Sequence, residues 1–139
     1  MSALGRLERV DLRAEWTKED RDFTPWLARE ENIRLLGETL NMSLEVEQEE
    51  RRVGRFSADI LCKDTGATDG GWVVIENQLE TTDHSHLGQI LTYAAGLEAK
   101  TCVWGAANFH EEHRAAIDWL NEISGDDHQF FGLEIELWR

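Results

Sequence analysis

The chain has 139 residues and a formal net charge of −14, from 28 acidic and 14 basic side chains. This length predicts a single domain with a core of its own, and a hydrophobic content of 41% agrees with a globular fold. No apolar run reaches the roughly 20 residues of a membrane helix, and the N-terminus lacks the layout of a secretory signal, so we expect a cytoplasmic protein. The acidic charge argues against generic nucleic-acid binding, because phosphate contacts need clustered Lys and Arg.

The predicted elements begin with a helix at 24–41, where Thr24 can act as N-cap and Pro25 as the first helical residue. Residues 1–23 show no comparable pattern. Strand-like runs follow at 43–49, 53–62 and 72–79, then a second helix at 83–97, a short apolar strand at 101–106, a third helix at 109–123 and a last strand at 129–138. Cys62 and Cys102 fall in separate apolar strands, which predicts buried free thiols and a reducing compartment.

This order predicts an α/β fold with an α-β-β-β-α-β core, in which helices flank a mixed central sheet. The strand at 101–106 returns after a helical crossover, so we expect it to lie parallel to a neighbour. The chain stops directly after the alternating strand at 129–138. We therefore expect residues 1–139 to be the N-terminal domain of a longer protein.

Two carboxylates stand out in neighbouring predicted strands. The loop at 63–71 is rich in turn formers, and a symmetric hairpin around it would pair Asp59 with Glu76 and Ser57 with Gln78. These four side chains would share one face, and the opposite face would carry Phe56, Ile60, Val73 and Ile75. Two crowded carboxylates either share a proton or hold a divalent cation. The plainer interpretation is that they are polar residues on the wet side of an antiparallel hairpin.

The second helix and the approach to Asp59 carry further polar signals. His86, Gln89 and Tyr93 follow one side of the helix, apart from its leucine face. This stripe is either a binding ridge or a half-exposed helix side. Basic residues cluster before Asp59, at Arg51, Arg52 and Arg55, where phosphate positioning and a solvated strand end are equally open.

Together these residues resemble the PD-(D/E)XK nuclease superfamily, in which an Asp lies on the second core strand and a (D/E)-x-K motif on the third. The matching positions are Asp59 and the run Glu76-Asn77-Gln78, and Gln89 with Tyr93 looks like the Q-x-x-x-Y motif of RecB-type members. Longer stretches at 22–27, 73–78 and 87–96 look like a bacterial family of uncharacterised, endonuclease-like proteins. The departure is Gln78, which stands where the superfamily has Lys.

The resemblance implies metal-dependent hydrolysis of the phosphodiester bonds of DNA or RNA. Asp59 and Glu76, with the backbone carbonyl of Asn77, would hold Mg²⁺ or Mn²⁺. Gln78 would orient the attacking water, and Gln89 and Tyr93 would position the substrate strand. Glu38 matches the place of an additional carboxylate in some superfamily members; the alternative there is a solvated helix residue.

Two alternatives stay open. His84, His86, His110 and His113 form two sequence pairs that could bind zinc, although solvated helix-start residues explain them as well. Because Gln78 lacks the charge of Lys, the chain could also be a catalytically silent, nuclease-like scaffold that binds a protein partner or nucleic acid.

Overall fold

The computed structural model describes residues 7–18, 22–68 and 71–138. Its centre is a five-stranded sheet in the order β2-β3-β4-β5-β6, formed by β2 (Leu44–Val53), β3 (Phe56–Asp64), β4 (Trp72–Thr81), β5 (Thr101–Asn108) and β6 (Gln129–Glu134). β3 is antiparallel to both of its neighbours, β2 and β4, whereas β4, β5 and β6 run parallel. The predicted α/β fold with a mixed sheet is therefore confirmed, including the parallel return of β5.

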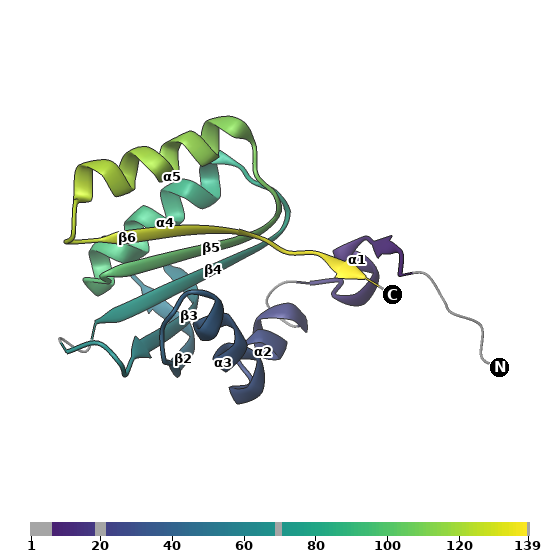
Figure 1. The fold of residues 1–139 in the computed structure, drawn as a ribbon, viewed down its shortest axis with the longest axis horizontal. Helices are drawn as coiled ribbons and strands as arrows, with labels where there is room; N and C mark the ends of the chain where they lie inside the picture. The colour runs from purple at the N-terminus through teal and green to yellow at the C-terminus, as the bar shows by residue number, and fades with distance from the viewer. Residues whose placement is uncertain (1–6, 19–21, 69–70, 139) are drawn as a thin grey trace.

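Helices cover both faces of this sheet (Figure 1). α4 (His84–Leu97) and α5 (Glu111–Ser124) lie on one face, and α2 (Thr24–Leu27) and α3 (Glu30–Thr39) lie on the other. The predicted helix at 24–41 is thus two helices. The chain turns at Ala28 and Arg29, where the Asn32 side chain donates to the backbone carbonyl of Trp26 at 2.7 Å.

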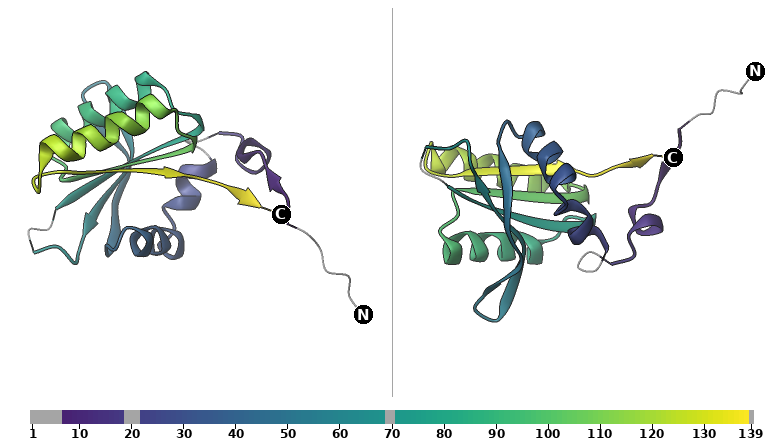
Figure 2. Two further views of the ribbon diagram at one scale, coloured as in Figure 1. Left: turned by 45° about the horizontal axis from the view of Figure 1, so that its top comes forward. Right: turned by 90° about the horizontal axis from the view of Figure 1, so that it is seen from below.

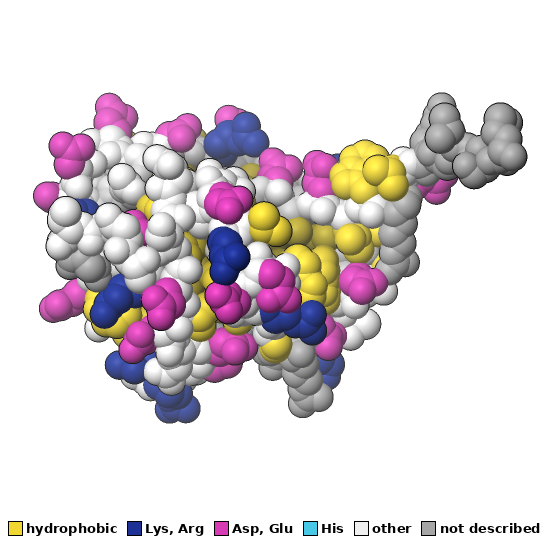
Figure 3. Space-filling view, turned by 60° about the horizontal axis from the view of Figure 1, so that its bottom comes forward, with side chains coloured by type: hydrophobic (Ala, Val, Ile, Leu, Met, Phe, Trp, Pro, Cys, Tyr) yellow, Lys and Arg dark blue, Asp and Glu magenta, His cyan; other side chains and the backbone are white. Residues whose placement is uncertain are grey.

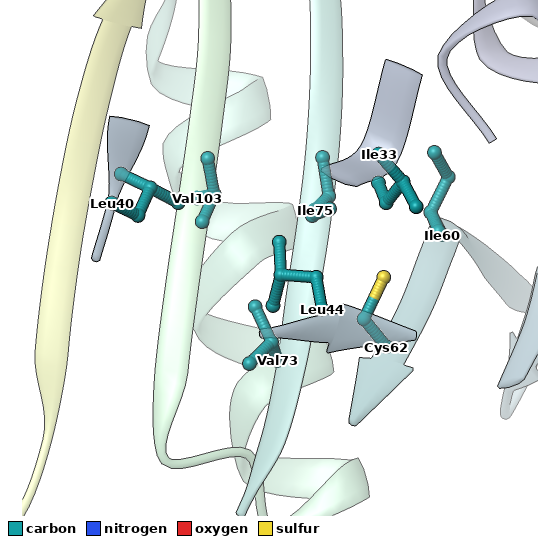
Figure 4. Close-up of a cluster of buried hydrophobic side chains, with 8 residues drawn as sticks. All are labelled: Ile33, Leu40, Leu44, Ile60, Cys62, Val73, Ile75 and Val103. Atoms are coloured by element: carbon teal, nitrogen blue, oxygen red, sulfur yellow. The ribbon is translucent and has the colours of Figure 1, made fainter. Parts of the chain in front are cut away.

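Alternation along the central strands supplies both apolar layers. On the α3 side, Ile33 and Leu40 pack with residues of β3, β4 and β5, as Figure 4 shows. That cluster consists of Ile33, Leu40, Leu44, Ile60, Cys62, Val73, Ile75 and Val103. On the α4 and α5 side, Val74 and Tyr93 belong to one cluster and Trp104 and Ile117 to another. Cys62 and Cys102 are free and buried, as predicted.

The β2–β3 hairpin differs from the prediction. The sequence suggested a break at 50–52, but β2 continues to Val53 and the chain reverses through Gly54 and Arg55. Gly54 has a φ of +60°, a value that glycine adopts without strain and that suits a tight turn. Phe56 consequently lies beside the turn and is 44% exposed, rather than packing with Ile60 as expected. The sequence did not predict that β2 continues to Val53, because the polar and mostly exposed residues of this strand show no alternation.

The β3–β4 register is the predicted one, from Lys63 paired with Trp72 to Ile60 paired with Ile75. Backbone pairing ends at Ile60 and Ile75. The expected pairs of Asp59 with Glu76 and of Ser57 with Gln78 do not form, because the two strands separate there. This opening creates the site described below.

The ends of the described chain lie past one end of the main sheet (Figure 2). The predicted strand at 129–138 is interrupted: β6 pairs with β5, while β7 (Leu137–Trp138) pairs with β1 (Arg9–Val10). A short helix, α1 (Leu12–Glu15), follows β1. Among the described residues, no helix is both long enough and apolar enough to cross a bilayer.

Candidate active site

The Asp59 side chain fills the gap where β3 and β4 separate. Its Oδ2 accepts a hydrogen bond from the backbone N–H of Asn77 at 2.8 Å. The carboxylate therefore replaces the backbone carbonyl that a continued ladder would have offered. This contact fixes Asp59 next to Glu76, which precedes Asn77 on β4.

Glu76 is the most perturbed acid of this site. It is only 4% exposed, and its Oε2 atom is buried without a hydrogen-bond partner. Burial raises the pKa of Glu76 to about 10, with further contributions from the negative charge of Asp59 and a side-chain hydrogen bond to Asp59. Burial and the neighbouring charge of Asp59 therefore favour the protonated form of Glu76.

Glu50 adds a third carboxylate, which the sequence reasoning missed. It lies on β2 between Glu49, which pairs with Ile60, and Arg51, which pairs with Ala58, and so is level with Asp59. Its charge contributes to the raised pKa values of Glu76 and Tyr93. A hairpin centred on Gly54 and Arg55 would have revealed this juxtaposition, but the predicted break separated Glu50 from the strand.

Tyr93 approaches the carboxylates from α4. It is 2% exposed, and burial together with the charges of Glu76, Asp59 and Glu50 raises the pKa of its phenol to about 12. The hydroxyl is therefore a neutral hydrogen-bond donor at physiological pH. Gln89 is one turn earlier on the same side of the helix and is half-buried. The structure thus places the predicted Gln-x-x-x-Tyr stripe on the helix that covers the site.

Gln78 is buried, and both hydrogens of its amide nitrogen are used in hydrogen bonds within the protein. Nε2 donates to the backbone carbonyl of Thr81 at 3.0 Å and to Oδ2 of Asp83 at 2.9 Å, while Oε1 accepts from Nε1 of Trp104 at 3.3 Å. An amide nitrogen has two hydrogens, so both donors are used. The remaining hydrogen-bonding capacity of Gln78 is the second lone pair of Oε1.

Glu38 is not brought to this site. It is exposed on α3, which covers the face formed by Ile60, Cys62 and Ile75. Glu76 follows Ile75 in β4 and points to the other face, where α4 lies. The solvated interpretation of Glu38 fits this position.

The histidines form hydrogen-bonded chains instead of a metal cage. His113 contacts Thr82 Oγ1 through Nδ1 at 2.6 Å and His84 through Nε2 at 2.8 Å, and His86 contacts Asp83 at 2.8 Å. Within residues 7–18, 22–68 and 71–138, no group of three or more His, Cys, Asp or Glu side chains is arranged to hold a metal ion. The zinc alternative therefore lacks the ligand set it needs.

The opposite side of the sheet carries an apolar cleft of about 520 Å³. Figure 3 shows hydrophobic side chains gathered in a hollow between charged groups. Trp16, Phe23 and Trp26 form one wall, and Ile75 and Val103 belong to the floor. The cleft is lined by few titratable groups, so the chemistry-bearing residues lie on the α4 side.

The carboxylate pair offers the kind of oxygen ligands that hard divalent cations prefer. Mg²⁺ and Mn²⁺ prefer oxygen ligands and commonly use one or two carboxylates together with waters and a substrate phosphate. Glu76 Oε2 is a buried oxygen without a partner, beside the anchored carboxylate of Asp59. Such an unsatisfied oxygen is costly, and a cation would satisfy it.

Comparison with known proteins shows that two solved endonuclease structures share this fold. No protein-family model matches the chain, and no curated protein matches it either. A repair endonuclease from Pyrococcus abyssi superimposes with a TM-score of 0.55 and 16% identity, covering 76% of this chain and 44% of its own. The EndoMS protein in complex with double-stranded DNA superimposes with a TM-score of 0.56 and 17% identity, covering 96% and 49%. The chain thus spans about half the length of these proteins and has a nuclease-like fold.

Proposed function

We propose that this chain is a nuclease domain that hydrolyses phosphodiester bonds of nucleic acid with Mg²⁺ or Mn²⁺. The observation that carries the proposal is the Asp59–Glu76 pair, with its buried and unpartnered Glu76 oxygen. The nuclease-like fold supports it, as does the double-stranded DNA in the EndoMS complex.

Asp59 and Glu76, with the backbone carbonyl of Asn77, would hold the cation. When bound, the cation would lower the pKa of water and offset charge on the phosphate. Asp59 needs no reordering, because the Asn77 N–H already fixes its carboxylate. Glu76 must give up its proton, since its neutral form is a poor ligand.

The remaining residues would position the reactants. The free lone pair of Gln78 Oε1 can accept a hydrogen bond from the attacking water and orient it, but the neutral amide cannot supply the charge of a lysine. Tyr93 offers a neutral O–H donor close to the carboxylates. Gln89, one turn away, would contact the substrate strand.

One observation favours a second function, the catalytically silent scaffold. Both amide hydrogens of Gln78 are used inside the protein, so this residue serves the local structure at the position where the superfamily has its lysine. A scaffold would bind nucleic acid or a protein partner without cutting it.

Cleavage assays separate the two functions. The chain should be incubated with double-stranded DNA, single-stranded DNA and RNA, each with Mg²⁺, Mn²⁺ or EDTA. We expect metal-dependent cleavage that is lost in Asp59→Asn and Glu76→Gln and kept in Glu122→Ala, an exposed acid on α5. If wild type and Gln78→Lys cut none of these substrates, the scaffold function holds.

A further inference from the structure

The tip of the β2–β3 hairpin is a concentrated basic surface on an acidic protein. Arg51, Arg52 and Arg55, called the basic tip below, are three of the 14 basic residues, and all are exposed. No acidic residue occurs from 51 to 58. The hairpin projects from the body of the molecule in Figure 2, and basic side chains gather at the lower left of Figure 3, where it ends.

The contacts that the arginines of the basic tip make are with neutral groups. Arg51 donates to the Gln48 side chain at 2.9 Å, Arg52 lies 3.5 Å from the backbone carbonyl of Gly54, and Arg55 stacks over the Phe56 ring at 5.3 Å. Three exposed arginines elsewhere in the described chain do pair with carboxylates: Arg9 with Glu136, Arg34 with Glu30, and Arg114 with Glu134. The two sets offer a matched comparison, since both contain three exposed arginines.

The hairpin places the basic tip between its turn and the carboxylates. Glu50 and Asp59 each lie four residues from the turn at Gly54 and Arg55, which is about 13 Å along the strands. Val53, beside the turn, packs against α4 at Gly96. The tip is therefore braced on the same helix that carries Tyr93.

That helix does not repel a polyanion. α4 contains no Lys, Arg, Asp or Glu over its 14 residues, from His84 to Leu97. It is the longest stretch without an acid in a chain of net charge −14. A phosphate backbone that crosses α4 thus meets a neutral surface between the basic tip and the carboxylate site.

We propose that Arg51, Arg52 and Arg55 are positioning residues that bind the phosphate backbone of double-stranded DNA beside the carboxylate site. Arg51 lies one residue from the level of Asp59 and Arg55 lies four residues, or about 13 Å, from it. At 3.4 Å per base pair, the tip contacts would therefore extend from beside the carboxylate site to about four base pairs away. This placement rests on the proposed nuclease function. The backbone contact itself does not depend on cleavage.

Binding should be measured in an Asp59→Asn background, where metal loading and hydrolysis do not interfere. Anisotropy of a fluorescent DNA duplex gives Kd across a salt series. We expect replacement of the three tip arginines by Ala to weaken binding at least tenfold and to reduce the slope of log Kd against log salt by about 2 to 3 units, close to 0.9 for each lost phosphate contact. Replacement by Lys should keep most of the slope, because the charge remains.

The matched control replaces Arg9, Arg34 and Arg114 by Ala, which changes net charge by the same amount. This variant should bind like the parent. Equal weakening by both triple variants would overturn the proposal, because the effect would then come from net charge alone, and so would an absence of duplex binding by the parent. Stronger binding to single-stranded DNA or RNA than to the duplex would also overturn it. Tip-dependent binding without cleavage by the wild type would refute the nuclease function and leave the contact standing.

Discussion

Val53 and Gly96 touch across the hairpin and α4: a Cβ atom built on Gly96 would lie 2.6 Å from Cγ1 of Val53. Such a distance is shorter than side chains tolerate, so the close approach depends on glycine. Gly88, two turns earlier in α4, has no atom within 4 Å of the corresponding position. The two glycines therefore provide a direct test of how the hairpin is braced.

Gly88→Ala should raise the free energy of unfolding by about 0.5 to 1 kcal/mol, because Ala favours the helix interior. Gly96→Ala should lack this gain and be less stable than Gly88→Ala by about 1 kcal/mol or more, since Val53 must move. Urea unfolding of both variants measures the difference. Equal stabilisation at the two sites would show that the hairpin is not held against α4.

In the absence of metal, Asp59→Asn and Asp59→Ala should have different effects on the free energy of unfolding. The Asn side chain still offers an oxygen to the Asn77 N–H and removes a negative charge, so the free energy of unfolding should stay equal or rise by up to about 1 to 2 kcal/mol. Ala leaves that N–H without its acceptor and should cost about 1 to 3 kcal/mol. Thermal unfolding in EDTA measures the stability of both variants relative to wild type. If the two variants lose stability equally, the 2.8 Å contact contributes nothing.

The stability of the metal-free protein should fall as the pH rises from about 5 to 9. In the unfolded chain Glu76 ionises near its usual pKa of 4.5, whereas in the folded protein its pKa is about 10, so the folded state binds more protons in this window. The contribution is at most about 1.4 kcal/mol per pH unit. Glu76→Gln removes it, and the stability of this variant relative to wild type should therefore increase with pH. A constant difference would mean that Glu76 is ionised in the fold.

Metal binding should release a proton. Calorimetry with Mn²⁺ near pH 7 should give an enthalpy that changes with the ionisation enthalpy of the buffer, because Glu76 loses its proton to the solvent. Affinity should rise by up to about tenfold per pH unit below the pKa of Glu76. Asp59→Ala and Glu76→Ala should abolish binding, and Glu122→Ala should leave it intact. Loss in all three variants would indicate diffuse attraction to an acidic surface.

Gln78→Ala should destabilise the fold by about 1 to 3 kcal/mol, because the Trp104 N–H, the Thr81 carbonyl and Asp83 lose a buried partner. Cleavage by this variant should be about ten- to a thousand-fold slower at temperatures where it is folded, if Oε1 orients the water. Gln78→Lys should keep a donor towards Asp83 and retain or raise activity. An inactive but folded Gln78→Lys, beside an active wild type, would show that the amide oxygen is essential.

The sequence predicts the fold well because most of its signals are local. The apolar runs that begin β4 and β5, and the caps at Asp83 and Gly125, placed their elements closely. The tight turn at Gly54 was missed, since β2 is an exposed edge strand whose polar residues follow no period. Missing this short turn also meant missing Glu50, because the position of the turn decides which β2 residue lies level with Asp59.

The candidate site was predictable in its residue types but not in its contacts. The hairpin register predicts that Asp59 and Glu76 lie close together, and helical spacing predicts that Tyr93 lies on the same side of α4 as Gln89. The partners of Gln78 come from Thr81, Asp83 and Trp104, and their convergence depends on how β4 ends and α4 begins. Glu38 shows the opposite case, a plausible residue type on the wrong side of the sheet.

The β2–β3 hairpin carries the basic tip and two of the three carboxylates on one continuous element, so their separation is built into the chain. If both contact DNA, the hairpin works as a ruler, and its length sets where the backbone is cut relative to where it is gripped. Adding two residues between Glu50 and Arg51 and two between Ala58 and Asp59 would preserve the strand faces and move the whole basic tip about 7 Å from the carboxylates. The cut would then move about two base pairs along the duplex.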